Sequence, residues 1–379
     1  MASKARRWIG RGVLALAGLA IGVLVIEMGA RLLPANAAAE MLFNAPQNTP
    51  PGMYSNDHQT VFRPTPGFEG TMRSLGYSVP IQVNSLGLRG PEPVNNEQPR
   101  WLALGDSFTF AAQVPEEQSF VGLLGDSQQV QLFNAGSDGY GTRHALARFR
   151  QLEDKLAPEL VVLIFFTGND FSDNEQWRDA IRRAKERPDG AAIMGGPKPP
   201  LRSFLNKNSV IYGMFNMRKR AKAMTDGKSP EVRRWRREMS IFHRSGRMEL
   251  RKGIDTTRMP MEELRDRVER KGGRLMVAVA SPAFAVEDHR TQATFELVNL
   301  DLSEAELAAP ETETLKLLKE LEIPSCSLDT PLRQAYAEGE RLYLAYDGHW
   351  SPAGHLVVAQ ALEDCLAEHG LAEKATGAQ

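Results

Sequence analysis

A continuous apolar run from Leu160 to Thr167 (LVVLIFFT) constrains the fold more than any other segment of the chain. A strand that faces water on one side alternates apolar and polar residues, whereas a strand that is covered on both faces is apolar throughout. The run therefore predicts a central strand of a parallel sheet that has helices on both of its faces.

Strand and helix patterns alternate around this run. Short apolar runs predict strands at residues 101–105, 130–134, 274–281 and 326–328. Helical patterns occupy residues 117–124, 143–156, 262–270, 314–321 and 353–366. Repeated strand–helix units predict the α/β class, as a doubly wound, three-layer α/β/α domain with a mainly parallel sheet. In such a domain, ligands bind beyond the carboxyl ends of the strands.

The composition excludes several classes of protein. Hydrophobic residues make up 42% of the 379 residues and charged residues 25%, which argues against global disorder and against a polytopic membrane protein. The net charge of −1 argues against a dedicated nucleic-acid binder. Two cysteines are too few for a disulfide framework or a Cys-based zinc site. Cys326 and Cys365 are 39 positions apart and fit either one bridge in an oxidising compartment or two buried thiols.

The N-terminal segment has the pattern of a membrane anchor. Four basic residues precede an apolar stretch over residues 12–26, namely Lys4, Arg6, Arg7 and Arg11. A full span needs about 20 residues, which flanking apolar residues supply when Arg11 and Arg31 snorkel to the two interfaces. Positive charge before the stretch keeps the N-terminus cytoplasmic. We therefore expect residues 1–33 to form a cytoplasmic tip and a transmembrane signal-anchor helix, with a periplasmic or cell-surface body.

A cleaved signal peptide is the alternative interpretation of this segment. Ala35-Asn36-Ala37 and Ala37-Ala38-Ala39 both fit a small-residue cleavage site, although Glu27 and Arg31 place charges where a signal peptide is normally uncharged. Both interpretations export the rest of the chain.

Composition shifts divide the remainder into segments. Residues 34–56 are rich in Pro, Ala and Asn and predict a tether. Residues 57–99 alternate apolar and polar positions between Gly and Pro residues, which predicts a small strand and loop extension. The main domain is expected over residues 100–368, with a basic insertion near 175–255, and residues 369–379 form a tail.

The stretch over residues 201–252 departs from the even charge balance, with 15 Lys and Arg against 4 Asp and Glu. Its densest part is the run Arg233–Arg237 (RRWRR). Such a block fits a solvated helix face, or a contact with anionic lipid headgroups or an acidic polysaccharide.

Four polar motifs follow predicted strands or precede the last predicted helix. They are Gly105-Asp106-Ser107 after the first strand, the turn over residues 134–141 after the second, Gly168-Asn169-Asp170 after the third, and Asp347-Gly348-His349 near the C-terminus. In a doubly wound sheet these motifs converge on one edge. That edge would hold what acyl transfer requires: a nucleophile, a base with an orienting carboxylate, and donors for an oxyanion.

At these residues the sequence resembles the SGNH family, the GDSL-type serine hydrolases. The family's signatures match Gly105 to Ser107, Gly139, Asn169, and Asp347 to His349, in the family's order. The resemblance covers about residues 100–366. It implies a flavodoxin-like three-layer fold and a serine acyl hydrolase that uses no metal and no cofactor.

The last motif departs from the common family pattern, which places Asp three residues before His. Here Asp347 lies two residues before His349. This spacing looks like that of the envelope polysaccharide acetyltransferases related to the family. It leaves the acceptor of the acyl group open between water and a sugar hydroxyl.

The chemistry assigns a role to each motif. Ser107 Oγ would attack an ester carbonyl, His349 would accept the proton, and Asp347 would orient and stabilise the imidazolium. The Ser107 N–H, the Gly139 N–H and the Asn169 side chain would bind the oxyanion.

Each assignment has an alternative. Gly136 or Gly141 can replace Gly139 as donor, and His355 is a second candidate for the base. Asp106 and Asp170 are expected to fix their turns through side-chain to backbone bonds, and Trp350 fits either a site wall or the core.

We therefore expect an exported, membrane-tethered serine acyl hydrolase whose partners are the membrane and an ester substrate carried by an envelope glycan, a lipid or a small molecule. An O-acetyltransferase with the same triad is the second hypothesis. A catalytically silent envelope-binding module that keeps the fold is the third.

Overall fold

The computed structural model describes residues 49–74, 76–186, 230–345 and 347–372, together with residues 21–29 and the single positions 11, 14, 17, 18, 209 and 212. Its main sheet has five parallel strands in the order β6-β5-β7-β8-β9. They are β5 (Arg100–Leu104), β6 (Gln131–Asn134), β7 (Leu160–Phe166), β8 (Arg274–Ala280) and β9 (Ser325–Ser327). In chain order this is 2-1-3-4-5, the order of flavodoxin-like sheets. The predicted α/β class with a parallel sheet is confirmed.

The central strand β7 is buried on both faces, which explains its unbroken apolar sequence. Val161, Leu163 and Phe165 enter one core cluster, and Val162, Ile164 and Phe166 enter the other. Successive side chains of a strand point to opposite faces, so both sets must be apolar when helices cover both faces.

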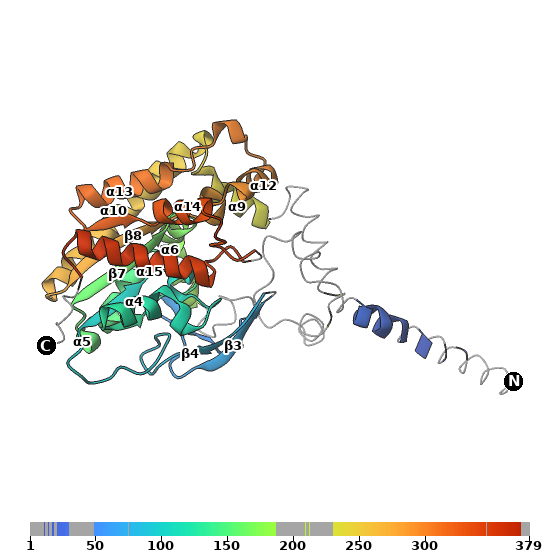
Figure 1. Cartoon of the computed structure of the whole chain (residues 1–379), viewed down its shortest axis with the longest axis horizontal. Helices are drawn as coiled ribbons and strands as arrows, with labels where there is room; N and C mark the ends of the chain where they lie inside the picture. The colour runs from blue at the N-terminus through green and yellow to red at the C-terminus, as the bar shows by residue number, and fades with distance from the viewer. Residues whose placement is uncertain are drawn as a thin grey trace.

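Two helical layers enclose the sheet (Figure 1). On one face lie α5 (Thr142–Leu156), α10 (Arg247–Arg270) and α13 (Ala309–Glu320). On the other face lie α4 (Phe120–Gln128), α14 (Asp329–Ala337) and α15 (Pro352–Glu368). The remaining described helices are α3 (Ser107–Phe110), α6 (Asp170–Glu186), α9 (Pro230–Ser240), α11 (Ala283–Val286), α12 (Asp288–Val298) and the 3-10 turns η1 (Glu116–Gln118), η2 (Arg244–Gly246) and η3 (Leu302–Glu304).

The helix expected at residues 262–270 is the last part of a much longer one. Helix α10 spans 24 residues, from Arg247 to Arg270, and contains Pro260. A proline inside a helix removes one backbone hydrogen bond and usually marks a boundary. Here Pro260 is buried together with Met261 and Leu264, so packing against the sheet maintains the helix through the proline.

Two short hairpins precede the main domain. Strand β1 (Tyr54–Asp57) pairs with β2 (Val61–Pro64), and β3 (Glu69–Ser74) pairs with β4 (Tyr77–Gln82), both antiparallel. Strand β1 begins at Tyr54, so the last residues of the segment 34–56, which was predicted to be a tether, form a strand. A third core cluster joins the hairpins to the main domain, and it contains Met53, Met72, Val79, Ile81, Val83, Phe110 and Ala112.

Several expectations concern residues outside the described ranges. Four predicted segments lie there wholly or in large part: most of the predicted anchor, residues 34–48 of the predicted tether, most of residues 187–229 in the basic insertion, and residues 373–379 of the tail. Within the described part of the chain, no helix combines the length and the hydropathy that a membrane span requires.

The two cysteines form a disulfide bond between β9 and α15. The Cα atoms of Cys326 and Cys365 are 6.1 Å apart. The spacing left open whether the two cysteines form one bridge or stay as two buried thiols, and the structure has the bridge. It joins an edge strand of the sheet to the helix that follows the motif Asp347-Gly348-His349.

Loss of this bridge should lower the stability of the main domain. A loop closed by residues 39 positions apart corresponds to about 4 kcal/mol in the chain-entropy account, and the melting temperature should fall by roughly 10 °C. Thermal melts with and without dithiothreitol measure this shift. The double variant Cys326→Ser/Cys365→Ser is the control, since reductant should leave its melting temperature unchanged. A wild-type melting temperature that ignores the reductant would contradict the prediction.

Candidate active site

The turn after β5 presents Ser107 at the carboxyl edge of the sheet. Gly105 has φ +149, and a Cβ atom there would lie 2.9 Å from the carbonyl oxygen of Ile164, so only glycine fits without a shift of the backbone. Asp106 caps α3, because its Oδ1 accepts a hydrogen bond of 2.9 Å from the Phe108 N–H. Ser107 is the first residue of α3, and its N–H therefore has no acceptor within the helix.

His349 lies 242 residues after Ser107 in the chain, and its side chain contacts both this serine and Asp347. His349 Nε2 lies 2.7 Å from Ser107 Oγ, and His349 Nδ1 is hydrogen-bonded to Asp347 Oδ1. The side chains of His349 and Asp347 are 16% and 3% exposed. A carboxylate at Nδ1 keeps the proton on that nitrogen and leaves Nε2 as the acceptor for the serine proton.

Gly348 makes the two-residue spacing possible. Its φ is +78, a left-handed conformation that turns the chain sharply between Asp347 and His349. With glycine between them, the two side chains meet although they are separated by one residue only.

The electrostatic surroundings of His349 favour its protonated form. Burial alone lowers the pKa of His349, but the charge and the hydrogen bond of Asp347, together with the charges of Asp106 and Asp138, raise the pKa above its ordinary value. As a proton acceptor the imidazole must be neutral, so a larger fraction is in the active form at mildly alkaline pH.

Asp347 has two further hydrogen-bond donors that the sequence did not indicate. The hydroxyl of Tyr77 in β4 donates to Asp347 Oδ2 at 2.7 Å, and the side chain of Gln113 donates to Asp347 Oδ1 at 3.4 Å. In the sequence, Tyr77 is only one position of the alternating pattern that predicts strands and loops over residues 57–99. No local signal in the sequence relates it to a carboxylate 270 residues away.

The two candidate oxyanion donors on other turns lie at the same sheet edge. Gly139 follows β6 and has φ +68, and nothing lies within 4 Å of the place a Cβ atom would take, so this position faces open space. Asn169 follows β7, and its amide already donates to Asp173 Oδ2 at 2.7 Å. An amide has two N–H groups, so this bond leaves one for a ligand. The turns after β5 and β6 are in contact, since the Ser137 N–H donates to the Gly105 carbonyl.

The other residues singled out from the sequence have structural partners. Asp106 and Asp170 bind backbone N–H groups of Phe108 and Phe166, as expected for residues that fix turns. His355 Nδ1 accepts a hydrogen bond of 3.2 Å from the N–H of the first residue of α4. Burial lowers the pKa of His355 to about 3, so it is neutral and lies within the core.

Trp350 belongs to the core as well. Its side chain is buried, and its ring lies 4.8 Å from that of Phe108 in an edge-to-face arrangement. Gly136 is closely packed, since a Cβ atom there would lie 2.5 Å from the Phe110 nitrogen. The space near Gly139 is open by comparison.

The described part of the basic insertion touches the rim of this edge. In α9, Arg233, Arg236 and Arg237 are exposed to solvent. Arg234 lies 2.7 Å from Glu238 and 3.9 Å from Asp173, the carboxyl group that holds the Asn169 amide. Burial raises the pKa of Asp173 to about 8, although Arg234 opposes this. Within the described ranges, no cluster of His, Cys, Asp or Glu side chains could hold a metal ion.

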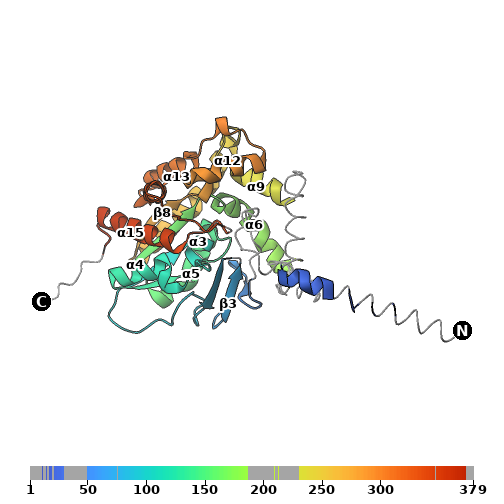
Figure 2. The same cartoon turned by 45° about the vertical axis from the view of Figure 1, so that its right-hand side comes forward.

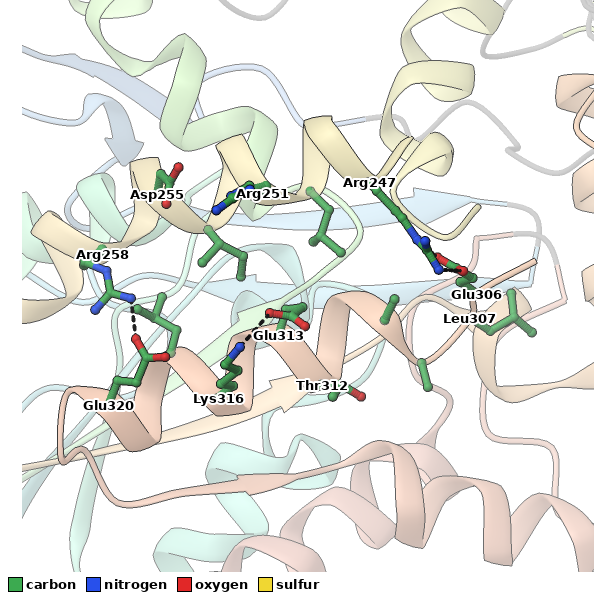
Figure 3. A pocket seen from close by; sticks show the side chains of 15 residues that line it. Arg247, Arg251, Asp255, Arg258, Glu306, Leu307, Thr312, Glu313, Lys316 and Glu320 are labelled. Atoms are coloured by element: carbon green, nitrogen blue, oxygen red, sulfur yellow. Dashed lines mark hydrogen bonds and ion pairs between the residues drawn. The ribbon is translucent and has the colours of Figure 1, made fainter. Parts of the chain in front are cut away.

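A separate cavity of about 870 Å³ lies between α10 and α13 (Figure 3). Six of its eight charged side chains form ion pairs with one another: Arg258 lies 2.5 Å from Glu320, Lys316 lies 3.9 Å from Glu313, and Arg247 pairs with Glu306. None of the site residues predicted from the sequence lines it. The candidate active site is therefore the sheet edge around Ser107.

The comparisons with solved structures give distant likenesses. An α/β hydrolase, LAE5, from the metagenome of Lake Arreo in Spain is 16% identical, over 73% of this chain and 97% of that chain, with a TM-score of 0.37. A catalytic mutant of Axe2, an acetylxylan esterase from Geobacillus stearothermophilus, is 11% identical over 73% and 96%, with a TM-score of 0.36. With TM-scores below 0.5, these likenesses support no conclusion about this chain.

A family model matches the part of the chain that contributes His349 and Asp347. Residues 242–379 match the model described as "SGNH hydrolase-like domain, acetyltransferase AlgX". No curated protein matches the chain. The family match supports the SGNH resemblance indicated by the motifs: residues 242–379 are similar to an SGNH hydrolase-like domain.

Proposed function

We propose that this protein is a serine acyl hydrolase that cleaves carboxylic esters through a covalent acyl-Ser107 intermediate. The observation that supports the proposal is the continuous hydrogen-bond chain from Ser107 Oγ to His349 Nε2 and from His349 Nδ1 to Asp347. A half-buried serine and imidazole with a buried carboxylate behind them, in this order, form the arrangement that activates a hydroxyl group as a nucleophile.

The reaction follows from these contacts. Ser107 Oγ attacks the ester carbonyl carbon while His349 Nε2 accepts the hydroxyl proton, and Asp347 stabilises the imidazolium. The oxyanion would receive hydrogen bonds from the Ser107 N–H, the Gly139 N–H and the Asn169 side chain. The imidazolium then returns its proton to the departing alcohol. In the second half, an incoming hydroxyl group attacks the acyl-serine, with His349 again as the base.

Labelling with a fluorophosphonate probe tests the nucleophile. The wild type should be labelled on Ser107, and Ser107→Ala should not react. Asp347→Asn should reduce ester turnover by a factor on the order of 10,000, and Asn169→Ala by roughly 100- to 1,000-fold through loss of an oxyanion donor. Mass spectrometry of the labelled peptide identifies the modified residue.

Ser127→Ala provides the matched control for this experiment. Ser127 lies in α4, where its hydroxyl group binds the Leu124 carbonyl. Its removal should leave labelling and turnover unchanged. A folded wild type that is not labelled would reject the proposal and leave the silent envelope-binding module. A Ser107→Ala variant that is still labelled would reject Ser107 as the nucleophile.

Transfer of the acyl group to a sugar hydroxyl is the second candidate function. It is favoured by the match of residues 242–379 to a model named for the acetyltransferase AlgX and by the Asp347-Gly348-His349 spacing. Both functions share the acyl-Ser107 step and differ only in the hydroxyl group that attacks it.

An acceptor experiment separates these two functions. A chromogenic acetyl ester is incubated with the enzyme, with and without an acidic oligosaccharide. A hydrolase should turn over the ester at a rate independent of the sugar and should release acetate. A transferase should turn over faster with the sugar and yield acetylated oligosaccharide, detected by mass spectrometry. Esterified sugar as the main product would replace hydrolysis by transfer as the function.

We further propose that the protein is exported and tethered to the membrane by its N-terminal segment. In the described residues 21–29, large apolar side chains are exposed, among them Ile21, Leu24 and Val25. The Cys326–Cys365 bridge supports an oxidising compartment, since structural disulfides are rare in the cytosol.

Fractionation of the host cells tests the tether. The full chain should stay in the membrane fraction after an alkaline carbonate wash, which strips peripheral proteins. A chain without residues 1–33 should appear in the soluble fraction with the same ester turnover. If expression of the full chain instead gives a soluble product that mass spectrometry shows to be cut after residue 37 or 39, the N-terminal segment is a cleaved signal peptide.

A further inference from the structure

The carboxylate of Asp347 is enclosed by donors that come from three separate parts of the chain. One oxygen binds His349 and Gln113, and the other binds Tyr77. The Asp347 side chain is 3% exposed, so protein donors replace most of the water that a carboxylate would otherwise bind. A buried carboxylate without such donors is costly and tends to take up a proton.

The hairpin β3–β4 delivers Tyr77 to this carboxylate. Val79 and Ile81 lie on the same face of β4 as Tyr77, because side chains two apart share a face of a strand. Both are buried in the cluster that also contains Phe110 of α3, and Figure 2 shows β3 beside α3. The packing of the hairpin therefore directs the Tyr77 hydroxyl towards the main domain. Its bond to Asp347 Oδ2 is 2.7 Å long, the length typical of a hydroxyl that donates to a carboxylate.

Arg89 holds the loop that contains Gln113. Its guanidinium group donates to the carbonyls of Phe110 and Val114, at 2.6 Å each, and to that of Ala111. Arg89 is 3% exposed, and its backbone N–H binds the Asn134 carbonyl at the end of β6. The loop from Ala111 to Val114 is thereby fixed against the sheet edge, with Gln113 facing Asp347.

We propose that Tyr77 and Gln113 are positioning residues that fix the Asp347 carboxylate, and that the segment before the main domain is a component of the active site. This inference rests on the proposed function. Neither residue touches the reacting atoms. Their hydrogen bonds hold both Asp347 oxygens and thereby hold the His349 Nδ1 proton in place, so that Nε2 faces Ser107.

The Tyr77 hydroxyl also offsets part of the charge that His349 experiences. The groups that face the imidazole are Asp347, Asp106 at the start of α3 and Asp138 in the turn after β6, all of which raise its pKa. The O–H dipole of Tyr77 has its positive end at Asp347. Its removal leaves the full negative charge to the imidazolium, so the protonated form of His349 becomes more stable. In a plot of kcat/KM against pH, the rate falls at low pH because His349 becomes protonated. This acidic limb should then move to higher pH.

The substitution Tyr77→Phe tests the inference with little change in volume. We expect kcat/KM for a chromogenic ester, and the rate of fluorophosphonate labelling, to fall by about 10-fold, as for loss of one charge-assisted hydrogen bond. The acidic limb should move upward by a few tenths of a pH unit. In an Asp347→Asn background, the same substitution should have little further effect on labelling, because the charged acceptor is absent. Gln113→Leu should have a smaller effect in the same direction.

Tyr336→Phe is the matched control. It removes the hydroxyl group of a tyrosine on α14 that is hydrogen-bonded to His289 of α12 and to no residue of the candidate triad, and it should leave rate and pH profile unchanged. Circular dichroism and thermal melts establish that each variant is folded. If Tyr77→Phe does not fold, the rate and the pH profile of Gln113→Leu test the inference instead.

The outcomes separate this inference from the proposed function. If wild type is labelled on Ser107 but Tyr77→Phe keeps its rate and its acidic limb, the positioning role is wrong and the enzyme remains. An equal loss of rate with and without the Asp347 carboxylate would also reject the role. If wild type is not labelled, the NMR signal of the His349 Nδ1 proton still decides. It should shift in Tyr77→Phe, and an unmoved signal overturns the inference.

Discussion

Burial of both faces of the parallel sheet is the constraint on which the rest of the structure depends. Helices cover each face, so the sheet can offer polar side chains to solvent only at the ends of its strands. All five strands run in the same direction, and the turns after β5, β6 and β7 therefore meet at one edge. Ser107, Gly139 and Asn169 each follow one of these strands. Their common location is a consequence of topology, and the chemistry of the edge depends on which residues occupy the turns.

Much of this arrangement could be predicted because it depends on local patterns. An unbroken apolar run identified β7, and the order of strands and helices identified the α/β class. The contact between His349 and Ser107 was expected from the convergence of motifs at one edge, and the structure brings these side chains within 2.7 Å. Helix α10 was underestimated, because Pro260 suggests a boundary that packing overrides. Pairing of Cys326 with Cys365 stayed open, since sequence spacing does not determine the distance between two side chains.

The contacts of Tyr77 and Gln113 could not be predicted for a different reason. The contact of Tyr77 depends on how a small hairpin docks on the main domain, and the contact of Gln113 depends on the loop after α3 that Arg89 holds. Both are decided by the packing of residues from distant segments. Alternation in the sequence gives the face of β4 on which Tyr77 lies, but not what that face contacts. Asn169 is different: its bond to Asp173, four residues later at the start of α6, is local, whereas the approach of Arg234 of α9 to Asp173 depends on tertiary packing.

Several buried carboxyl groups give the edge an unusual electrostatic character. Burial raises the pKa of Asp106 to about 7 and that of Asp170 well above its ordinary value. Near neutral pH these groups are therefore partly or fully protonated, which limits the negative charge close to the candidate nucleophile. Asp347 differs from them, because three donors surround its carboxylate. Asp106, one of whose oxygens has no hydrogen-bond partner, and Asp347, whose two oxygens both have donors, thus act on the same imidazole.

The docking of the β3–β4 hairpin has a consequence for where the enzyme begins. By topology the α/β unit starts at Arg100, yet a side chain that contacts the candidate triad comes from Tyr77 and the loop beside it is pinned by Arg89. The residues that contact the candidate triad therefore begin earlier in the chain than the α/β unit does. A chain trimmed to the boundaries of the sheet would keep Ser107, His349, Asp347 and Gln113 but would lack Tyr77 and Arg89.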